Sequence, residues 1–87
     1  MKWRIITDRP RNGAENMAVD EAILESVVNK SSAPVIRFYS WSSPCVTIGY
    51  FQRMYEAIDV DEVDANSLDL VRRPTGGRAI LHSDELT

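Results

Sequence analysis

The lengths of the apolar runs constrain the fold of this chain more than any other feature of its sequence. Only one stretch, AENMAVDEAILESVVN at residues 14–29, is long enough and rich enough in helix formers to make a helix of several turns. The other apolar runs are short and rich in β-branched and aromatic residues, as in WRIIT and VIRFYSW, which is typical of strands. The sequence therefore predicts an α+β fold, with one main helix packed on one face of a mostly antiparallel or mixed sheet.

The connections between these runs predict which strands pair. Because SSP and RPTGG are short, we expect each to close an antiparallel hairpin, with a short acidic helix between the two hairpins. The 87 residues contain no internal repeat and no linker, which indicates one unit with a small core. The expected elements in chain order are a strand at 3–7, a helix at 14–29, strands at 35–41 and 45–50, a helix at 59–65, and strands at 68–71 and 79–82.

Asp20 interrupts the apolar stripe of the predicted main helix, three residues after Met17. One interpretation is that the helix turns toward solvent at this point. The other is that Asp20 or Glu21 turns inward and meets an arginine from residues 71–82. The sequence leaves both open and favours the first, which needs no partner.

Charges are segregated in the C-terminal half, although the net charge is only -3. Residues 56–69 contain six acidic side chains and no Lys or Arg, whereas residues 71–82, VRRPTGGRAILH, contain three arginines, the only histidine and no acid. Gly76 and Gly77 can direct backbone N–H groups toward one point, and Arg73 lies close by. The pattern predicts either a site for an anion or an exposed hairpin turn with solvated arginines, and composition alone leaves both open.

Arg72 and Arg73 are neighbours in a predicted strand, so their side chains must point to opposite faces. At most one of them can join a given site, and we expect the other to form an ion pair, with the acidic helix as its candidate partner. The segment is neither a P-loop nor a dinucleotide-binding fingerprint, because the Gly-Lys pair of the first motif and the GxGxxG spacing of the second are both missing.

Few side chains in this sequence are suited to chemistry. Cys45 is the single cysteine, which rules out an internal disulfide, and it has no cationic neighbour in the sequence, so we interpret it as structural. His82 has no second histidine or cysteine nearby, so no metal site is predicted. Trp41 ends its strand, either as a core residue or as a flat apolar wall for a ligand. No run resembles a signal peptide or a membrane span, which predicts a cytoplasmic location.

Four stretches together resemble the biotin/lipoate protein ligase and octanoyltransferase superfamily. They are NMAVDE at 16–21, VIRFYSW at 35–41, VTIGYFQ at 46–52 and RRPTGGRAILH at 72–82. The resemblance implies that residues 1–87 are the N-terminal portion of a single, truncated lipoate-ligase-like catalytic domain. Lipoate ligases usually carry a third glycine where Arg78 stands, so this chain is more similar to the lipoate-ligase-like octanoyltransferases. Glu85-Leu86-Thr87 agrees with that comparison, whereas Ser83 stands where an aspartate commonly follows the histidine.

The resemblance also implies a site and a reaction. The residues that would line the acyl pocket and its polar mouth are Trp41, Arg73, Thr75, Gly76, Gly77, Arg78, Ala79 and His82. The family's transferases move an octanoyl group from octanoyl-acyl carrier protein to a lysine of a lipoyl domain or of a glycine-cleavage H-type protein. They act through a cysteine thioester with a lysine nearby. Cys45 does not match that cysteine, which the resemblance places beyond Thr87, so we expect no catalytic residue and no transfer activity in this chain alone.

Three functions remain open at this point. The octanoyltransferase needs no cofactor, and an ATP-dependent lipoate–protein ligase of the same superfamily would need ATP and Mg²⁺. The third function is an anion-binding or nucleic-acid-binding module built on the arginines of residues 71–82. The net charge of -3 disfavours it, because nucleic-acid binding normally needs a broad basic face, and we expect neither nucleic acid nor membrane as a partner.

Overall fold

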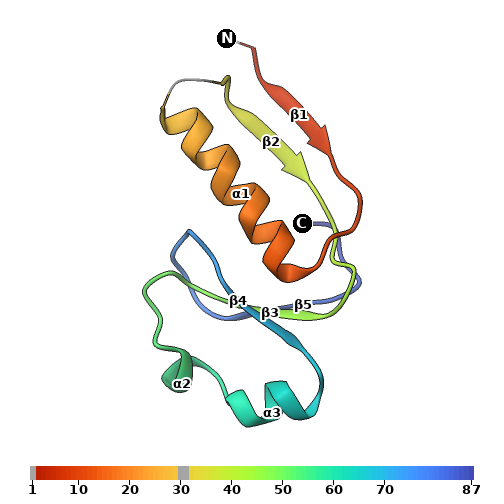
Figure 1. The fold of residues 1–87 in the computed structure, drawn as a ribbon, viewed down its shortest axis with the longest axis vertical. Coiled ribbons are helices and arrows are strands. Elements are labelled where there is room, and N and C mark those ends of the chain that lie inside the picture. Colours follow the sequence, from red (N-terminus) through yellow and green to blue (C-terminus); the bar gives the residue numbers. More distant parts are fainter. Residues whose placement is uncertain (1, 30–31) are drawn as a thin grey trace.

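The computed structural model describes residues 2–29 and 32–87 and contains two small sheets and one long helix. Strands β1 (Arg4–Thr7) and β2 (Val35–Phe38) form a two-stranded sheet beside helix α1 (Gly13–Val28). As Figure 1 shows, the second sheet crosses the middle of the molecule below this unit, and two short helices lie at the far end. The predicted main helix is confirmed within one residue at each end.

Helix α1 begins where the sequence supplies its own cap. The Asn12 side chain accepts a hydrogen bond from the backbone N of Glu15, and the Glu15 carboxylate accepts one from the backbone N of Asn12. This reciprocal capping box satisfies two N–H groups that the first turn would otherwise leave without partners. Asn29 ends the helix, and its backbone N–H donates to the Glu25 and Val27 carbonyls.

The second sheet has the order β4-β3-β5, with β3 (Cys45–Ile48) at its centre. Strand β4 (Asp69–Arg72) pairs with β3 in parallel, and β5 (Ile80–His82) pairs with it antiparallel. All four residues of β3 are buried, as expected for a central strand. The predicted fold class, α+β with one main helix and a mixed sheet, is confirmed.

Both predicted hairpins are wrong. Strand β3 has both edges filled by β4 and β5, so β2 cannot pair with it across the Ser42–Pro44 connection. Instead, β2 pairs in parallel with β1, because the chain returns through helix α1 and so enters both strands in the same direction. The segment between β4 and β5 likewise does not close a hairpin, since these strands lie on opposite edges of β3.

The link from β3 to β4 contains the two short helices. Helix α3 (Val60–Ala65) confirms the predicted acidic helix, and the Asp59 side chain caps it by accepting a hydrogen bond from the Glu62 backbone N at 3.1 Å. Helix α2 (Met54–Ala57) was not predicted, because four residues are too few to show a helical pattern. This long crossover explains why β3 and β4 are parallel.

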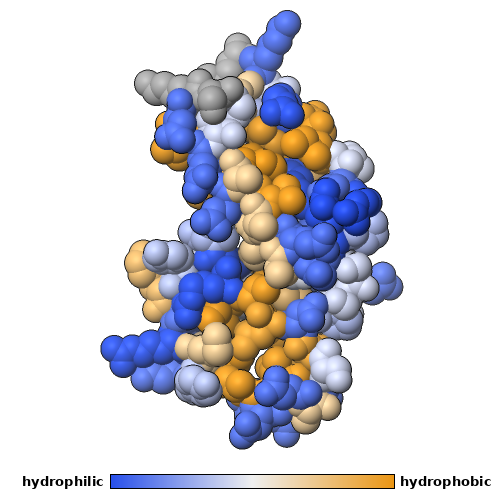
Figure 2. All heavy atoms as spheres, viewed as in Figure 1, coloured by the Kyte–Doolittle hydropathy of each residue, from blue (hydrophilic) through white to orange (hydrophobic). Residues whose placement is uncertain are grey.

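The core is small and lies where α1 meets the second sheet. Its buried cluster contains Met17, Tyr39, Trp41 and Cys45, with Val71 packed against it. Many apolar side chains remain at the surface, and Figure 2 shows apolar side chains gathered over the β1–β2 sheet and, in the lower half of the view, over the second sheet and toward the short helices. No helix in the described part of the chain is long and apolar enough to cross a membrane.

Candidate acyl-binding site

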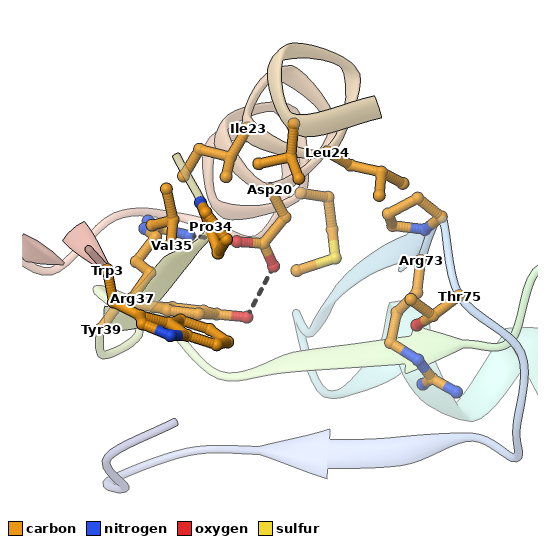
Figure 3. Close-up of a pocket in the computed structure, with 13 residues that line it drawn as sticks. Trp3, Asp20, Ile23, Leu24, Pro34, Val35, Arg37, Tyr39, Arg73 and Thr75 are labelled. Atoms are coloured by element: carbon orange, nitrogen blue, oxygen red, sulfur yellow. Dashed lines mark hydrogen bonds and ion pairs between the residues drawn. The ribbon is translucent and has the colours of Figure 1, made fainter. Parts of the chain in front are cut away.

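A groove of about 500 Å³ lies between helix α1, the start of β2 and the segment that follows β4 (Figure 3). Its volume falls within the ~300–1,000 Å³ usual for small-molecule sites. Apolar side chains from α1 and β2 form most of its wall, and polar groups lie on two sides of it, Asp20 with Arg37 and Tyr39 on one side and Arg73 with Thr75 on the other. The lining residues are Trp3, Met17, Asp20, Ile23, Leu24, Val27, Pro34, Val35, Arg37, Tyr39, Arg73, Pro74 and Thr75.

Asp20 turns inward, so the interpretation that α1 turns to solvent at this point is wrong. Its carboxylate accepts hydrogen bonds from Arg37 Nη1 at 2.8 Å and from the Tyr39 hydroxyl at 2.9 Å (Figure 3). The arginine that meets it comes from β2 rather than from residues 71–82. The reason is that β2 lies directly beside α1, whereas the arginines of residues 71–82 point elsewhere.

Arg37 is the centre of a buried charge network. Its side chain is only 4% exposed, and its guanidinium pairs with Asp8 at 2.8 Å as well as with Asp20. It also donates to Asn16 Oδ1 at 2.8 Å and lies over the Tyr39 ring, 3.9 Å from the ring centre. Arg37 Nε is buried without a hydrogen-bond partner among the described residues. The network fixes one end of the groove rigidly, because each acceptor is matched to a charged donor.

This network shifts the pKa of two of its members. Hydrogen bonds from Arg11 and Arg37 hold the pKa of the Asp8 carboxyl well below its usual range. Burial, and then the hydrogen bond to the Asp20 carboxylate, raises the pKa of the Tyr39 hydroxyl above its usual value. At neutral pH Asp8 is therefore charged and Tyr39 is a neutral hydrogen-bond donor.

Arg73 clamps the glycine loop internally rather than leaving its guanidinium free for a ligand. Nη1 donates to Thr47 Oγ1 at 2.7 Å, and Nη2 donates to the carbonyls of Gly76 at 2.9 Å and Arg78 at 2.8 Å. Gly77 has a φ of 98°, a left-handed conformation that favours glycine. The loop packs closely against the end of β3, where a Cβ on Gly49 would collide with the Gly77 carbonyl.

Arg72 points to the other face of the strand, as the sequence predicts, but it forms no ion pair with the acidic helix. Its Nη1 donates to three backbone carbonyls, those of Gly49 at 3.1 Å, Tyr50 at 2.9 Å and Gln52 at 2.6 Å. The predicted ion pair is therefore wrong, because the irregular chain after β3 supplies backbone carbonyls within reach of the guanidinium. Within residues 2–29 and 32–87 the exposed Arg78 guanidinium makes neither a hydrogen bond nor an ion pair.

Trp41 and His82 lie in the core rather than in the wall of the groove. Their rings stack with centroids 4.1 Å apart and planes 18° from parallel, and both residues are buried. His82 Nε2 lies 3.0 Å from Thr47 Oγ1, the same oxygen that accepts from Arg73. The core interpretation of Trp41 is therefore confirmed, and a shared hydroxyl connects the ring pair to the clamp on the glycine loop.

Cys45 is fully buried beside α1. Burial, with a smaller contribution from Asp69, raises the pKa of the Cys45 thiol to about 11, so the side chain stays protonated and weakly nucleophilic at neutral pH. The structural interpretation of this cysteine agrees with its position. In the part of the chain that the structure describes, no three His, Cys, Asp or Glu side chains come together as a metal site.

The structure divides the eight sequence-predicted site residues into three places. Arg73 and Thr75 border the groove, and Trp41 and His82 stack in the core. The loop from Gly76 to Ala79 lies at the surface beside Arg73. Sequence reasoning missed Thr47, which joins these parts, although a lone hydroxyl between the buried apolar residues of CVTI is a usable signal.

A long helix on small mixed sheets, with a glycine loop beside an apolar groove, is the architecture of a known family. The chain belongs to the lipoyl protein ligase A/B catalytic domain family, whose profile matches residues 12–87. The resemblance stated from the sequence is thereby confirmed.

Individual relatives divide between two activities. The chain is 51% identical over 85 residues to octanoyltransferase LipM of Carboxydothermus hydrogenoformans, covering 98% of this chain and 32% of that protein. It is 45% identical over 86 residues to octanoyltransferase LipM of Clostridioides difficile, covering 99% and 32%. The chain thus spans about a third of the length of the curated relatives that it matches.

The solved structures similar to this chain include lipoate ligases. A T. acidophilum protein assigned as a lipoate protein ligase, with bound lipoic acid, superposes with a TM-score of 0.81 at 38% identity, covering 95% of this chain and 34% of that one. A lipoate-protein ligase A bound with ATP gives a TM-score of 0.71 at 32% identity, with coverage of 95% and 33%.

Proposed function

We propose that this chain forms part of the acyl-binding region of an octanoyltransferase of protein lipoylation. The donor would be octanoyl-acyl carrier protein, and the acceptor a lysine of a lipoyl domain or of an H-type protein. The observation that carries the proposal is the apolar groove whose polar end lies at Arg73 and Thr75, within a chain 45–51% identical to octanoyltransferases along almost its whole length.

An octanoyl chain matches the chemistry of the groove. Its six methylenes would contribute roughly 5 kcal/mol of binding free energy if all were buried, at ~0.8 kcal/mol each. Leu24, Val27 and Val35 supply the apolar surface for this burial. The acyl end would then face the polar groups near Arg73, where the carbonyl can accept a hydrogen bond.

In this proposal the eight sequence-predicted residues still form the acyl pocket and its polar mouth, and each group of them has a different part. Arg73 shapes the loop of Gly76 and Gly77, while Arg78 offers the free guanidinium for an anionic part of the donor. Thr75, which lines the groove, would border the acyl chain, and Ala79 would contact it from the neighbouring surface loop. Trp41 and His82 would form the inner wall once the rest of the domain completes the pocket.

The acyl transfer itself would use residues outside this chain. A cysteine thiolate would attack the thioester carbonyl of the donor, and the carrier's thiol would leave as that carbon–sulfur bond breaks. The acceptor lysine amine would then attack the new thioester, form the amide and release the cysteine thiol. Cys45 does not fit this role, because it is fully buried and protonated. Residues 1–87 thus serve as the N-terminal portion of the catalytic domain and lack transfer activity alone.

A second function is favoured by the solved relatives, one of which holds ATP and another lipoic acid. As a ligase, the protein would need ATP and Mg²⁺, and Arg78 is the guanidinium that could meet a phosphate without leaving an internal partner.

The test compares the two reactions in a full-length protein that contains this chain. Octanoyl-acyl carrier protein and a lipoyl domain are mixed with the enzyme, with and without ATP and Mg²⁺, and acylation of the lipoyl domain is followed by mass spectrometry. The transferase proposal expects transfer without ATP, and none with the 87-residue chain alone. Strict dependence on ATP and Mg²⁺, with free octanoate or lipoate as substrate, would refute it in favour of the ligase.

A further inference from the structure

The Glu85 carboxylate is the point at which two chains of hydrogen bonds end. One chain reaches it from His82, whose Nδ1 lies 3.2 Å from Glu85 Oε2. The other reaches the same oxygen from the Thr87 hydroxyl at 3.0 Å. The second carboxylate oxygen accepts from the backbone N of Ser83 at 3.2 Å, which holds the group in place.

The first chain has only one possible direction when the imidazole is neutral. An arginine can only donate, so Thr47 Oγ1 accepts from Arg73, and an ionised carboxylate can only accept, so His82 Nδ1 must carry the proton that faces Glu85. The remaining ring nitrogen, Nε2, is then an acceptor, and the Thr47 hydroxyl has its single proton left to donate to it across 3.0 Å. The Arg73 end alone would not fix the direction, because the Thr47 oxygen has two lone pairs and could accept from Arg73 and from the ring at once. The Glu85 carboxylate is therefore the group that sets the direction of the chain.

The second chain is directed in the same way. Trp41 Nε1 can only donate, and it lies 2.9 Å from Thr87 Oγ1. The Thr87 hydroxyl passes its own proton on to Glu85 Oε2. The stacked rings of Trp41 and His82 are therefore both oriented by the same carboxylate, one directly and the other through Thr87.

The Glu85 carboxyl group is ionised at neutral pH. Burial raises the pKa of its carboxyl, but hydrogen bonds from His82, Thr87 and Ser83 outweigh this, and the net pKa is lowered from its ordinary value. Its side chain is 37% exposed, whereas that of His82 is 8% exposed, so the carboxylate lies at the surface end of a buried network.

We propose that Glu85 is a positioning residue that selects the Nδ1–H tautomer of His82 and orients the Trp41–His82 ring pair. Through Thr47 the same network holds the Arg73 clamp on the glycine loop. What the ring pair and the loop bind rests on the proposed function, but the tautomer and its dependence on Glu85 do not.

The chain's single histidine makes the tautomer directly measurable. The ¹⁵N shifts of both ring nitrogens are recorded on labelled protein, with the pH raised until the ring signals no longer change. We expect a protonated Nδ1 and an unprotonated Nε2, the opposite of the tautomer that free imidazole side chains favour in water. A predominantly Nε2–H ring in the wild-type protein overturns the proposal, whatever the variants show.

Two variants assign the cause. Glu85→Ala should shift the ring toward the Nε2–H tautomer, whereas Asp84→Ala, which removes a neighbouring exposed carboxylate, should leave it unchanged. An Nδ1–H ring that persists in Glu85→Ala overturns the role of Glu85, as does an equal change in Asp84→Ala. Because Glu85 is partly exposed, its truncation opens no cavity in the core.

Thr87→Val separates the two chains. It removes the acceptor of the Trp41 indole N–H, so that signal should move upfield, while the His82 tautomer stays Nδ1–H. Loss of the Nδ1–H tautomer in Thr87→Val would contradict the two separate hydrogen-bond chains and would show that general packing holds the His82 ring. Failure of the transferase assay leaves all three results unaffected, so the two proposals fail independently.

Discussion

Arg37 provides a direct test of how much the buried charge network contributes to stability. In Arg37→Met the aliphatic stem keeps its packing, but Asp20 loses the cation that it meets at 2.8 Å, while Asp8 loses Arg37 and keeps Arg11, which also lies at 2.8 Å. Removing one partner of a buried ion pair typically costs ~3–5 kcal/mol, because the other charge stays behind unpaired. Asp8 keeps Arg11 and Asp20 is 30% exposed, so neither carboxylate is left fully stranded, and we expect the low end, about 3 kcal/mol.

The measurement is urea unfolding of the 87-residue chain at pH 7, with Arg9→Met as the matched control. Arg9 is exposed and its guanidinium forms no ion pair among the described residues, so its replacement should cost less than about 0.5 kcal/mol. Adding Asp20→Asn to Arg37→Met should recover part of the loss, since the stranded charge is then gone. An Arg37→Met loss no larger than that of Arg9→Met would refute the reasoning.

The same network predicts how stability depends on pH. The pKa of Asp8 is lower in the folded protein than in the unfolded chain, because its carboxylate accepts from Arg11 and Arg37. Its contribution is therefore fully present well above pH ~4, and is lost as the pH falls from there toward the folded value. In Arg37→Met this acid-side loss should become smaller, which acid titrations of the two proteins followed by circular dichroism would show.

Two further predictions concern the glycine loop and the cysteine. Arg73→Met should lower the free energy of unfolding by roughly 2 kcal/mol, because the buried Thr47 hydroxyl and two loop carbonyls lose their donor. The control Arg78→Met should change it by less than about 0.5 kcal/mol. Equal effects of the two substitutions in thermal unfolding would show that Arg73 does not hold the loop. Cys45 should react with a thiol reagent only as the protein unfolds, so rapid labelling of the folded protein at pH 8 would contradict its burial. Because the pKa of the buried thiol is raised, its contribution to stability should be present below the ordinary thiol pKa of 9.0 and lost as the pH rises toward about 11.

Local features of the fold were predictable from the sequence, and strand pairing was not. Helix α1 is long, and its pattern identifies it within one residue at each end. The hairpins failed because a three-residue connection such as Ser42–Pro44 only permits an antiparallel pair. Whether the pair forms depends on which strand edges are free, and both edges of β3 are paired with β4 and β5. That competition between distant strands leaves no mark in the connection itself.

The site shows the same division between local and non-local information. Asp20 was visible as an acid within an apolar stripe, but its partner depends on the register between α1 and β2, which the sequence does not display. Arg72 and Arg73 were correctly placed on opposite faces, since strand geometry alone requires it. Their acceptors were not foreseen, because most of them are backbone carbonyls outside regular structure, and the remaining contact, with Thr47, depends on how strand β3 lies beside β4.

These carbonyls explain why an arginine-rich glycine loop can occur without a bound anion. A loop that bends through Gly76 and Gly77 exposes carbonyl groups that no strand or helix pairs, and burying such groups unpaired is costly. Arg73 supplies several donors in one planar group and satisfies the loop from a single position. A cluster of arginines beside glycines therefore has two meanings, and burial distinguishes them: Arg73, held against a buried strand, shapes the loop. The exposed Arg78, which carries no internal partner, is the side chain that a negatively charged ligand would meet first.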